Sequence, residues 1–394
     1  MNETPFTQKF GQAPLSNQSG ILVNQAGATL NDAGGPYGVL VNAAGATVSN
    51  YGHLSVWGGS GYGTLKNYGA VENLAGTFSI GGKVANFGTL SNAAGAFLKN
   101  YSGGTLTNES GGTLTNAGAV YNLTGGRLYN SGAFTNQSGA TLVIQAGSYL
   151  TNTGGLTNQS GGNVNNAGHL ANSGTIANAG MVTVTSTGAI TGTGTFTQTA
   201  GVSQINGTMA QNQINIQGGQ LFGTGTLTGP VLNSGGIVQG GAAGAPGVLS
   251  IAGSFTQGSG GTLEELINGT GSGQYSVLAV TGSMSLDGSL DIVTGNGFTF
   301  AAGQTFTIAG FTPGSLTGNF ASLTEGSYSG NGMSVNIGNG LTIKALYNNS
   351  LGNIQLQVAA VPEPAESLLM LAGLGLLGLI GRRGKSRRTP IHRR

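Results

Sequence analysis

The chain has 394 residues, of which only 6% are charged, while 77 are glycine and none is cysteine. The lack of cysteine excludes disulfides and thiolate metal sites. The net charge of +2 is unevenly placed, because seven of the 13 Lys and Arg residues follow Ile380, and the chain before Val361 carries six basic and nine acidic residues. The body of the protein is therefore mildly acidic, which gives nucleic-acid binding little electrostatic support.

Residues 1–14 predict an irregular N-terminus. The first 13 residues contain Glu3 and one lysine but no apolar run, so they do not read as a signal peptide. A repeat unit already begins at Leu15, which would leave the first coil of a repeat structure uncapped. We therefore expect the start of the chain to be truncated or misassigned.

Residues 15–220 are built from one short unit: an apolar residue, any residue, an asparagine, and a glycine soon after. Examples are Leu90–Asn92, Leu106–Asn108, Leu114–Asn116 and Leu128–Asn130. Between Val84 and Val182 the apolar positions recur in steps of six or eight residues. Even steps keep the apolar side chains on one side of an extended chain, whereas a helix requires steps of three and four.

The units also form a longer period, since Val84, Leu106, Leu128 and Leu150 are each 22 residues apart and each interval holds three units. Three short strands joined by glycine-containing turns make one coil of a β-solenoid, whose coils stack as parallel strands. We predict an all-β protein with a parallel β-helix, right-handed, followed by a single C-terminal hydrophobic helix. A left-handed hexapeptide helix is the alternative, because many steps are six.

The recurring asparagines lie two residues after the apolar position, on the same side of the strand or at the corner. Stacked coils would place their amides one above another, and each amide offers two donors and an acceptor. Asparagine also tolerates the left-handed backbone of a tight corner. We predict a structural ladder of asparagines; the functional alternative is a polar strip that contacts glycans.

Residues 221–359 continue the alternation with longer units and more phenylalanine, as in Leu278/Val280 and Phe298/Phe300. We expect the last coils of the solenoid and a β-rich cap. The stretch that begins PGVLSIAGSFTQGSGGTLEELINGTG resembles the terminal passenger region of autotransporter-type β-helical adhesins, over residues 223–323. No outer-membrane barrel follows this stretch, so autotransport itself is not implied.

Catalysis has little support from the sequence, although polysaccharide lyases and hydrolases use the same scaffold. Glu264 and Glu265 are adjacent and point to opposite faces of a strand, and a glycine-containing turn separates Asp287 from Asp291. His53 and His169 precede repeat leucines in a variable, outward-facing slot. We predict that the chain is no enzyme and has no catalytic, cofactor or metal site, with a polysaccharide-active lyase or hydrolase as the alternative.

Residues 360–394 differ from the rest of the chain in three features that follow one another. Proline holds its own segment extended, so the first feature is an accessible motif. Next come an apolar run that can enter a bilayer and a cluster of cations suited to the cytoplasmic side. The motif is Val361, Pro362, Glu363 and Pro364; the helix is marked by Leu368, Leu369, Leu371, Leu374, Leu376, Leu377, Leu379 and Ile380; the cations are Arg382, Arg383, Lys385, Arg387 and Arg388.

This tail resembles the PEP-CTERM sorting signal of Gram-negative bacteria. The resemblance implies recognition by an exosortase-type membrane transpeptidase and cleavage near Pro362–Pro364. It also implies a precursor in the inner membrane and a surface or extracellular product, with exopolysaccharide or other glycans as partners. Family members carry an N-terminal export signal, and residues 1–13 depart from that pattern. The alternative is a plain membrane anchor, for which 17 residues from Ala365 to Gly381 are short.

Overall fold

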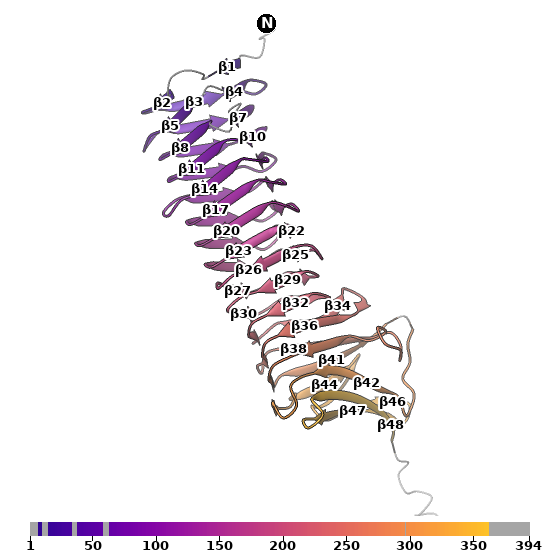
Figure 1. Cartoon of the computed structure of the whole chain (residues 1–394). Coiled ribbons are helices and arrows are strands. Elements are labelled where there is room, and N and C mark those ends of the chain that lie inside the picture. The colour runs from indigo at the N-terminus through magenta and orange to yellow at the C-terminus, as the bar shows by residue number, and fades with distance from the viewer. Residues whose placement is uncertain (1–6, 10–14, 34–37, 58–62, 296, 362–394) are drawn as a thin grey trace, which may run out of the picture.

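The computed structural model describes residues 7–9, 15–33, 38–57, 63–295 and 297–361. In this part of the chain every regular element is a β-strand, and the strands stack into a rod (Figure 1). Almost all strand pairs are parallel, so the predicted all-β parallel β-solenoid is confirmed. Its right-handed sense stays a prediction, and the predicted C-terminal helix lies outside the described residues.

Each coil contributes one strand to each of three faces. Face 1 consists of β1 (Thr7–Lys9), β4 (Thr29–Ala33), β7 (His53–Trp57), β10 (Thr77–Ile80), β13 (Phe97–Asn100), β16 (Ala119–Asn122), β19 (Thr141–Ile144), β22 (Asn163–Asn166), β25 (Met181–Val184), β28 (Val202–Ile205), β31 (Gln220–Gly223), β34 (Ile237–Ala242), β38 (Thr262–Ile267), β41 (Ser289–Thr294) and β44 (Ser322–Glu325).

Face 2 consists of β2 (Leu15–Asn17), β5 (Val39–Asn42), β8 (Thr64–Asn67), β11 (Lys83–Asn86), β14 (Thr105–Asn108), β17 (Arg127–Asn130), β20 (Tyr149–Asn152), β23 (His169–Asn172), β26 (Ala189–Thr191), β29 (Thr208–Ala210), β32 (Thr226–Thr228), β36 (Val248–Ala252), β39 (Val277–Val280) and β42 (Thr305–Gly310). A short strand, β35 (Ala245–Pro246), pairs antiparallel with β34.

Face 3 is a separate sheet of 14 strands: β3 (Ile21–Asn24), β6 (Thr47–Asn50), β9 (Ala70–Asn73), β12 (Thr89–Asn92), β15 (Thr113–Asn116), β18 (Ala133–Asn136), β21 (Gly155–Asn158), β24 (Thr175–Asn178), β27 (Thr195–Gln198), β30 (Gln213–Ile216), β33 (Val231–Asn233), β37 (Phe255–Gln257), β40 (Met284–Leu286) and β43 (Leu316–Gly318).

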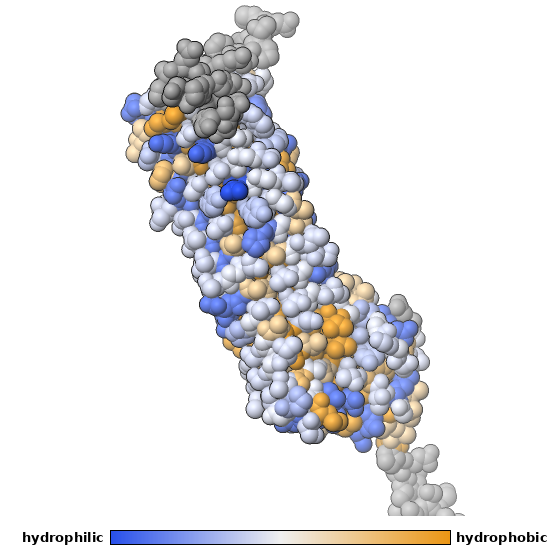
Figure 2. Space-filling view, viewed as in Figure 1, coloured by the Kyte–Doolittle hydropathy of each residue, from blue (hydrophilic) through white to orange (hydrophobic). Residues whose placement is uncertain are grey.

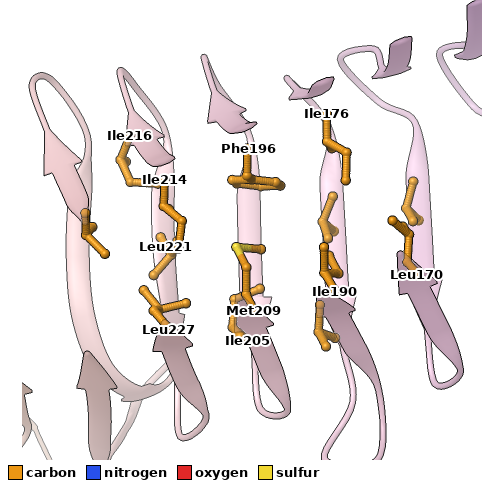
Figure 3. Packing of buried hydrophobic residues seen from close by; sticks show 14 of the residues in the cluster. Leu170, Ile176, Ile190, Phe196, Ile205, Met209, Ile214, Ile216, Leu221 and Leu227 are labelled. Carbon is orange, nitrogen blue, oxygen red and sulfur yellow. The ribbon is translucent and has the colours of Figure 1, made fainter. Parts of the chain in front are cut away.

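The strand register reproduces the period read from the sequence. Val84 pairs with Leu106, Leu106 with Leu128, and Leu128 with Leu150. These side chains point inward and are buried, as Figure 3 shows for the stacked residues Ile176, Phe196 and Ile214. Burying one such side chain contributes roughly 1.5–3 kcal/mol. An apolar column on each face, continued from coil to coil, therefore forms the core, and on face 1 a second inward residue such as Ile80, Ile144 or Val184 joins it.

The C-terminal end of the solenoid is closed by four antiparallel strands: β45 (Tyr328–Asn331), β46 (Ser334–Gly338), β47 (Leu341–Asn348) and β48 (Asn353–Ala360). β45 pairs with β44 of face 1, and β48 pairs with β42 of face 2. This meander joins faces 1 and 2 into one 34-stranded sheet. It lies at the end of the rod opposite β1, β2 and β3 (Figure 1).

The N-terminal region differs from the sequence-based expectation of an irregular segment up to residue 14. β1 already occupies Thr7–Lys9 and pairs in parallel with β4. The repeat motif does not show this strand, because pairing to the next coil requires only backbone groups. The predicted boundary at residue 220 is not marked by a break, since β28, β31 and β34 pair in sequence across it.

Candidate functional site

The asparagines that end the strands lie inside the rod and bond to one another. Along face 2 each Nδ2 donates to the Oδ1 of the next coil, as from Asn86 to Asn108 at 2.7 Å and from Asn108 to Asn130 at 2.8 Å. An equivalent ladder on face 3 runs from Asn24 to Asn178. Because these amides are buried, the structural prediction is confirmed and the ladder asparagines do not form a glycan-contacting strip.

A third, short ladder on face 1 explains an unpartnered atom. Asn100 donates to Asn122, but the residue before Asn100 in its column is Ile80, which has no donor. The buried Oδ1 of Asn100 accordingly has no hydrogen-bond partner among the described residues.

The acidic residues are placed largely as the sequence predicts. Glu264 is half-buried on the outside of β38, and Glu265, the next residue, is fully buried on the opposite side. On the next coil Asp291 lies beside Glu264, and the Thr324 hydroxyl donates to the Asp291 carboxylate. Burial, and then the charge of Asp291, raise the pKa of Glu264. Two carboxylates thus meet on face 1, a pairing that the sequence does not reveal.

Glu265 is an isolated buried acid. Both of its carboxyl oxygens lack a partner among the described residues. Burial, followed by the charge of Glu264, raises the pKa of Glu265 well above its ordinary value. A buried carboxyl without a counter-charge is held in its neutral form. Within the described part of the chain, no group of three or more His, Cys, Asp or Glu side chains is placed to hold a metal ion.

His53 and His169 occupy the outward-facing slot that was predicted for them. His53 is half-buried on β7, and burial followed by the charge of Lys99 lowers its pKa. The ring of His169 lies beside that of Tyr149, with 6.0 Å between centroids, and its Nε2 is 3.4 Å from the Thr191 hydroxyl. Neither histidine lies beside a carboxylate in the described register, which leaves them as surface residues of faces 1 and 2.

One group of aromatic side chains lies on the outside of face 1 and at its edge, and sequence reasoning missed it. Trp57 ends β7 and is 44% exposed; its ring meets Tyr101 edge-on, with 5.2 Å between centroids. Phe97, 40% exposed, lies alongside Tyr121 of the next coil at 6.3 Å. A Cβ added at Gly81 would lie 2.5 Å from the Trp57 ring, so this glycine lets Trp57 lie over the intervening coil. The sequence does contain an indication of this group, because its bulky residues occupy outward-facing repeat positions that usually hold Thr, Ser or Ala.

Two hollows adjoin these aromatic residues. One, of about 310 Å³, is lined by Phe97, Lys99, Tyr101, Tyr121, Leu123 and Gln145. The other, of about 340 Å³, lies on the far side of Phe97 and is lined by backbone and small side chains of three coils, including Ala94, Ala117 and Ser138. The Nζ atom of Lys99 lies 5.3 Å from the centroid of the Phe97 ring. We call the two hollows and their walls the face 1 trough.

The C-terminal junction places the sorting motif directly after the folded body. β48 ends at Ala360, and the amide of Val361 donates to the carbonyl of Gly340 at 2.7 Å. The rest of the predicted motif, the apolar run and the basic cluster lie outside the described residues. In the part of the chain that the structure does describe, no helix is long and apolar enough to cross a membrane.

Comparison with protein families finds the PEP-CTERM protein-sorting motif at residues 360–388. The chain therefore carries this motif on a β-solenoid body. The motif marks an exported protein that is anchored at the membrane before an exosortase-type enzyme processes it.

Comparison with solved structures finds similarity to the crystal structure of a TibA fragment that is hyper-glycosylated by TibC. The two chains share 17% identity with a TM-score of 0.33, and the alignment covers 78% of this chain and 100% of that one. No curated protein matches the chain.

Proposed function

We propose that this chain is a structural or adhesin-like protein of the cell surface or extracellular matrix. It is sorted and cleaved at its PEP-CTERM tail by an exosortase-type transpeptidase, in a Gram-negative bacterium that produces exopolysaccharide. The observation that carries the proposal is the motif at residues 360–388, which begins as the last strand ends at Ala360. A tail in this position leaves the folded body whole when it is cut.

The shape of the body supports a role in display. Fourteen coils stacked about 4.8 Å apart give a rod of roughly 65 Å, with the cap next to the tail and the first coils at the far end. Threonine, serine and other neutral side chains cover much of the outside, and Figure 2 shows mostly pale residues of intermediate hydropathy. Repeated weak hydrogen bonds from such a surface suit a long glycan partner, because repetition adds avidity.

Replacing Pro362, Glu363 and Pro364 together with alanine tests the sorting proposal. We expect the altered chain to accumulate in the membrane fraction at the full mass, whereas the wild type loses its tail. Fractionation followed by mass spectrometry measures both. Pro390→Ala is a matched control, since it changes a tail proline outside the matched residues. Normal cleavage and location of the triple variant would refute the proposal.

A polysaccharide-active enzyme is the second candidate, and the pairing of Glu264 with Asp291 on neighbouring coils is the observation that favours it. A carboxyl with a raised pKa beside a second carboxyl group suits general acid–base catalysis. The test is release of reducing ends from acidic and neutral polysaccharides by the wild type and by Glu264→Gln. Release that the substitution abolishes would make the chain an enzyme; we expect no release from either protein.

A further inference from the structure

The face 1 trough has the chemistry of a binding site for a polymer. Its two hollows span the same three coils and meet at Phe97, so an occupant that fills both must be extended. Aromatic rings form one half, and small side chains and backbone form the other. Flat apolar surface with polar groups at the margin is suited to a sugar ring, which has apolar C–H faces and hydroxyls at its edge.

The aromatic residues come from two neighbouring coils, and each ring is in contact with another ring: Phe97 with Tyr121, and Tyr101 with Trp57. Phe97 is the first residue of β13, Tyr101 directly follows β13, and Tyr121 lies on β16 of the next coil. Rings that already lie in contact lose little conformational freedom when a ligand binds. Trp57, the only tryptophan of the chain, extends this aromatic surface towards the N-terminal coils through its contact with Tyr101.

The charge of the trough selects the class of polysaccharide. Lys99 is a cation among the lining residues of the two hollows, and none of these residues is acidic. Its ammonium forms no ion pair with a described carboxylate and is held over the Phe97 ring. Gln145 adds an amide that can bond hydroxyls or a carboxylate. A sugar that carries a carboxylate would supply the missing anion.

We propose that the face 1 trough binds a carboxylated polysaccharide, with sugar faces packed on Phe97, Tyr101 and Tyr121 and a uronate paired with Lys99. This inference rests on the proposed surface function and names its partner by chemical class. A polymer that fills both hollows makes contacts in each, so affinity should rise with polymer length until both are filled.

Polygalacturonate is the probe, and the same polymer with its carboxyl groups reduced is the neutral counterpart. Binding to the immobilised full chain in detergent is measured by biolayer interferometry. Phe97→Thr and Tyr121→Thr restore a small residue common in their slots, so the coils should still form. We expect each to weaken binding of polygalacturonate by about tenfold or more, because truncating an aromatic anchor typically removes that much. Lys99→Gln should remove the preference for the charged polymer.

Tyr149→Thr is the matched control, because Tyr149 is also an exposed aromatic residue in the first slot of a strand but lies on face 2. It should bind as the wild type does. Circular dichroism melts of all variants show whether each one folds. Equal affinity for the charged and reduced polymers would overturn the uronate assignment. Unchanged binding by folded Phe97→Thr and Tyr121→Thr, or no binding by the wild type, would overturn the site.

Two further outcomes separate this inference from its alternatives. If light scattering shows a wild-type dimer that Phe97→Thr dissociates, a second copy covers the trough and the inference fails. Cell fractionation and mass spectrometry of Phe97→Thr should show normal sorting. Normal cleavage and location of the tail variant, together with intact binding of the polymer, would instead contradict the proposed function alone, because binding in vitro does not require the tail to be cut.

Discussion

At the residue scale, the side chain of Asn108 shows how a buried amide is satisfied. Its Nδ2 donates to Asn130 and to the carbonyls of Gly112 and Ala133, and its Oδ1 accepts from Asn86. Each contact joins one coil to another or closes the adjoining turn. The ladder therefore fixes the lateral position of each coil on the next one. The apolar columns alone do not fix this position.

Replacing Asn108 with leucine tests the ladder. The substitution leaves the buried Asn130 oxygen without its donor and removes the Asn108 bonds to two backbone carbonyls, whereas the Asn86 amide keeps its bonds to the carbonyls of Gly88 and Thr113. Each buried orphan costs about 1–3 kcal/mol. We expect a loss of roughly 3 kcal/mol, measured by denaturant unfolding. Asn165→Leu is the control, because Asn165 points outward and is exposed. Equal stability of the two variants would contradict a structural role for the ladder.

The buried acid Glu265 predicts a pH dependence of stability. Its pKa is raised in the fold, so between its unfolded value near 4.5 and its folded value the native state binds more protons than the unfolded state. The contribution of Glu265 to the free energy of unfolding is therefore fully present below about pH 4.5 and decreases as the pH rises. Glu264 acts in the same direction. The pKa of His53 is lowered from its ordinary value of 6.5, so this group acts in the opposite direction, and its contribution to stability falls as the pH drops below 6.5.

The measurement for Glu265 is the difference in melting temperature between the wild type and Glu265→Gln from about pH 5 to pH 9. The difference isolates this group, since Glu264 and His53 are present in both proteins. We expect the wild type to lose stability relative to the variant as the pH rises. A constant difference across this range would show that Glu265 is not held neutral in the fold.

At the element scale, the turns require glycine because successive coils pack backbone against backbone. Gly118 lies in the two-residue connection between β15 and β16. A Cβ at Gly118 would approach the carbonyl oxygens of Ala93 and Ala96 to 2.3 Å. Gly155, in contrast, opens β21 in a first slot where a Cβ would meet only the Thr175 hydroxyl at 3.8 Å.

These two glycines provide a matched pair of substitutions. Gly118→Ala should destabilise the protein by about 2 kcal/mol or more, because rigid backbone on the previous coil must shift. Gly155→Ala should be neutral or stabilise by up to about 1 kcal/mol, since it only reduces the freedom of the unfolded chain. Thermal melts followed by circular dichroism compare them. A smaller effect at Gly118 than at Gly155 would contradict the coil stacking described.

At the scale of the whole molecule, each coil contacts mainly its two neighbours, so a complete coil should be removable. Deleting residues 105–126 places Arg127 where Thr105 stood and restores the pairing of β17 on β11. The Asn86 amide would then meet Asn130. Such quasi-one-dimensional proteins keep folding when a whole repeat is lost.

The coil deletion has a frame-breaking control. Removing only residues 105–115 takes out half a coil. The apolar residues after the deletion would then lie opposite turns of the preceding coil. We expect the whole-coil deletion to keep a cooperative melt and a β-type circular dichroism spectrum, and the half-coil deletion to lose both. Loss of folding in both would show that the coils are not interchangeable units, which would contradict the repeat architecture.

The sequence by itself determined the core and the corners. Even steps between Leu106, Leu114 and Val120, with asparagine two residues after each, dictate inward apolar columns, because side chains alternate along any strand. The sorting tail was equally readable, since its motif is a linear one at residues 360–388. These features are local in the chain or repeat at a fixed period, so no three-dimensional information is required.

Only the tertiary structure decided which outward residues meet. Coil length varies, with 17 residues between the paired Ile214 and Val231 and 32 between Met284 and Leu316. Neighbours on the surface, such as Trp57 with Tyr101 or Glu264 with Asp291, therefore follow no fixed spacing. The closing of faces 1 and 2 by an antiparallel meander is likewise a long-range pairing of β44 and β42 with the cap. Such contacts depend on register set by stacking, and local alternation does not encode it.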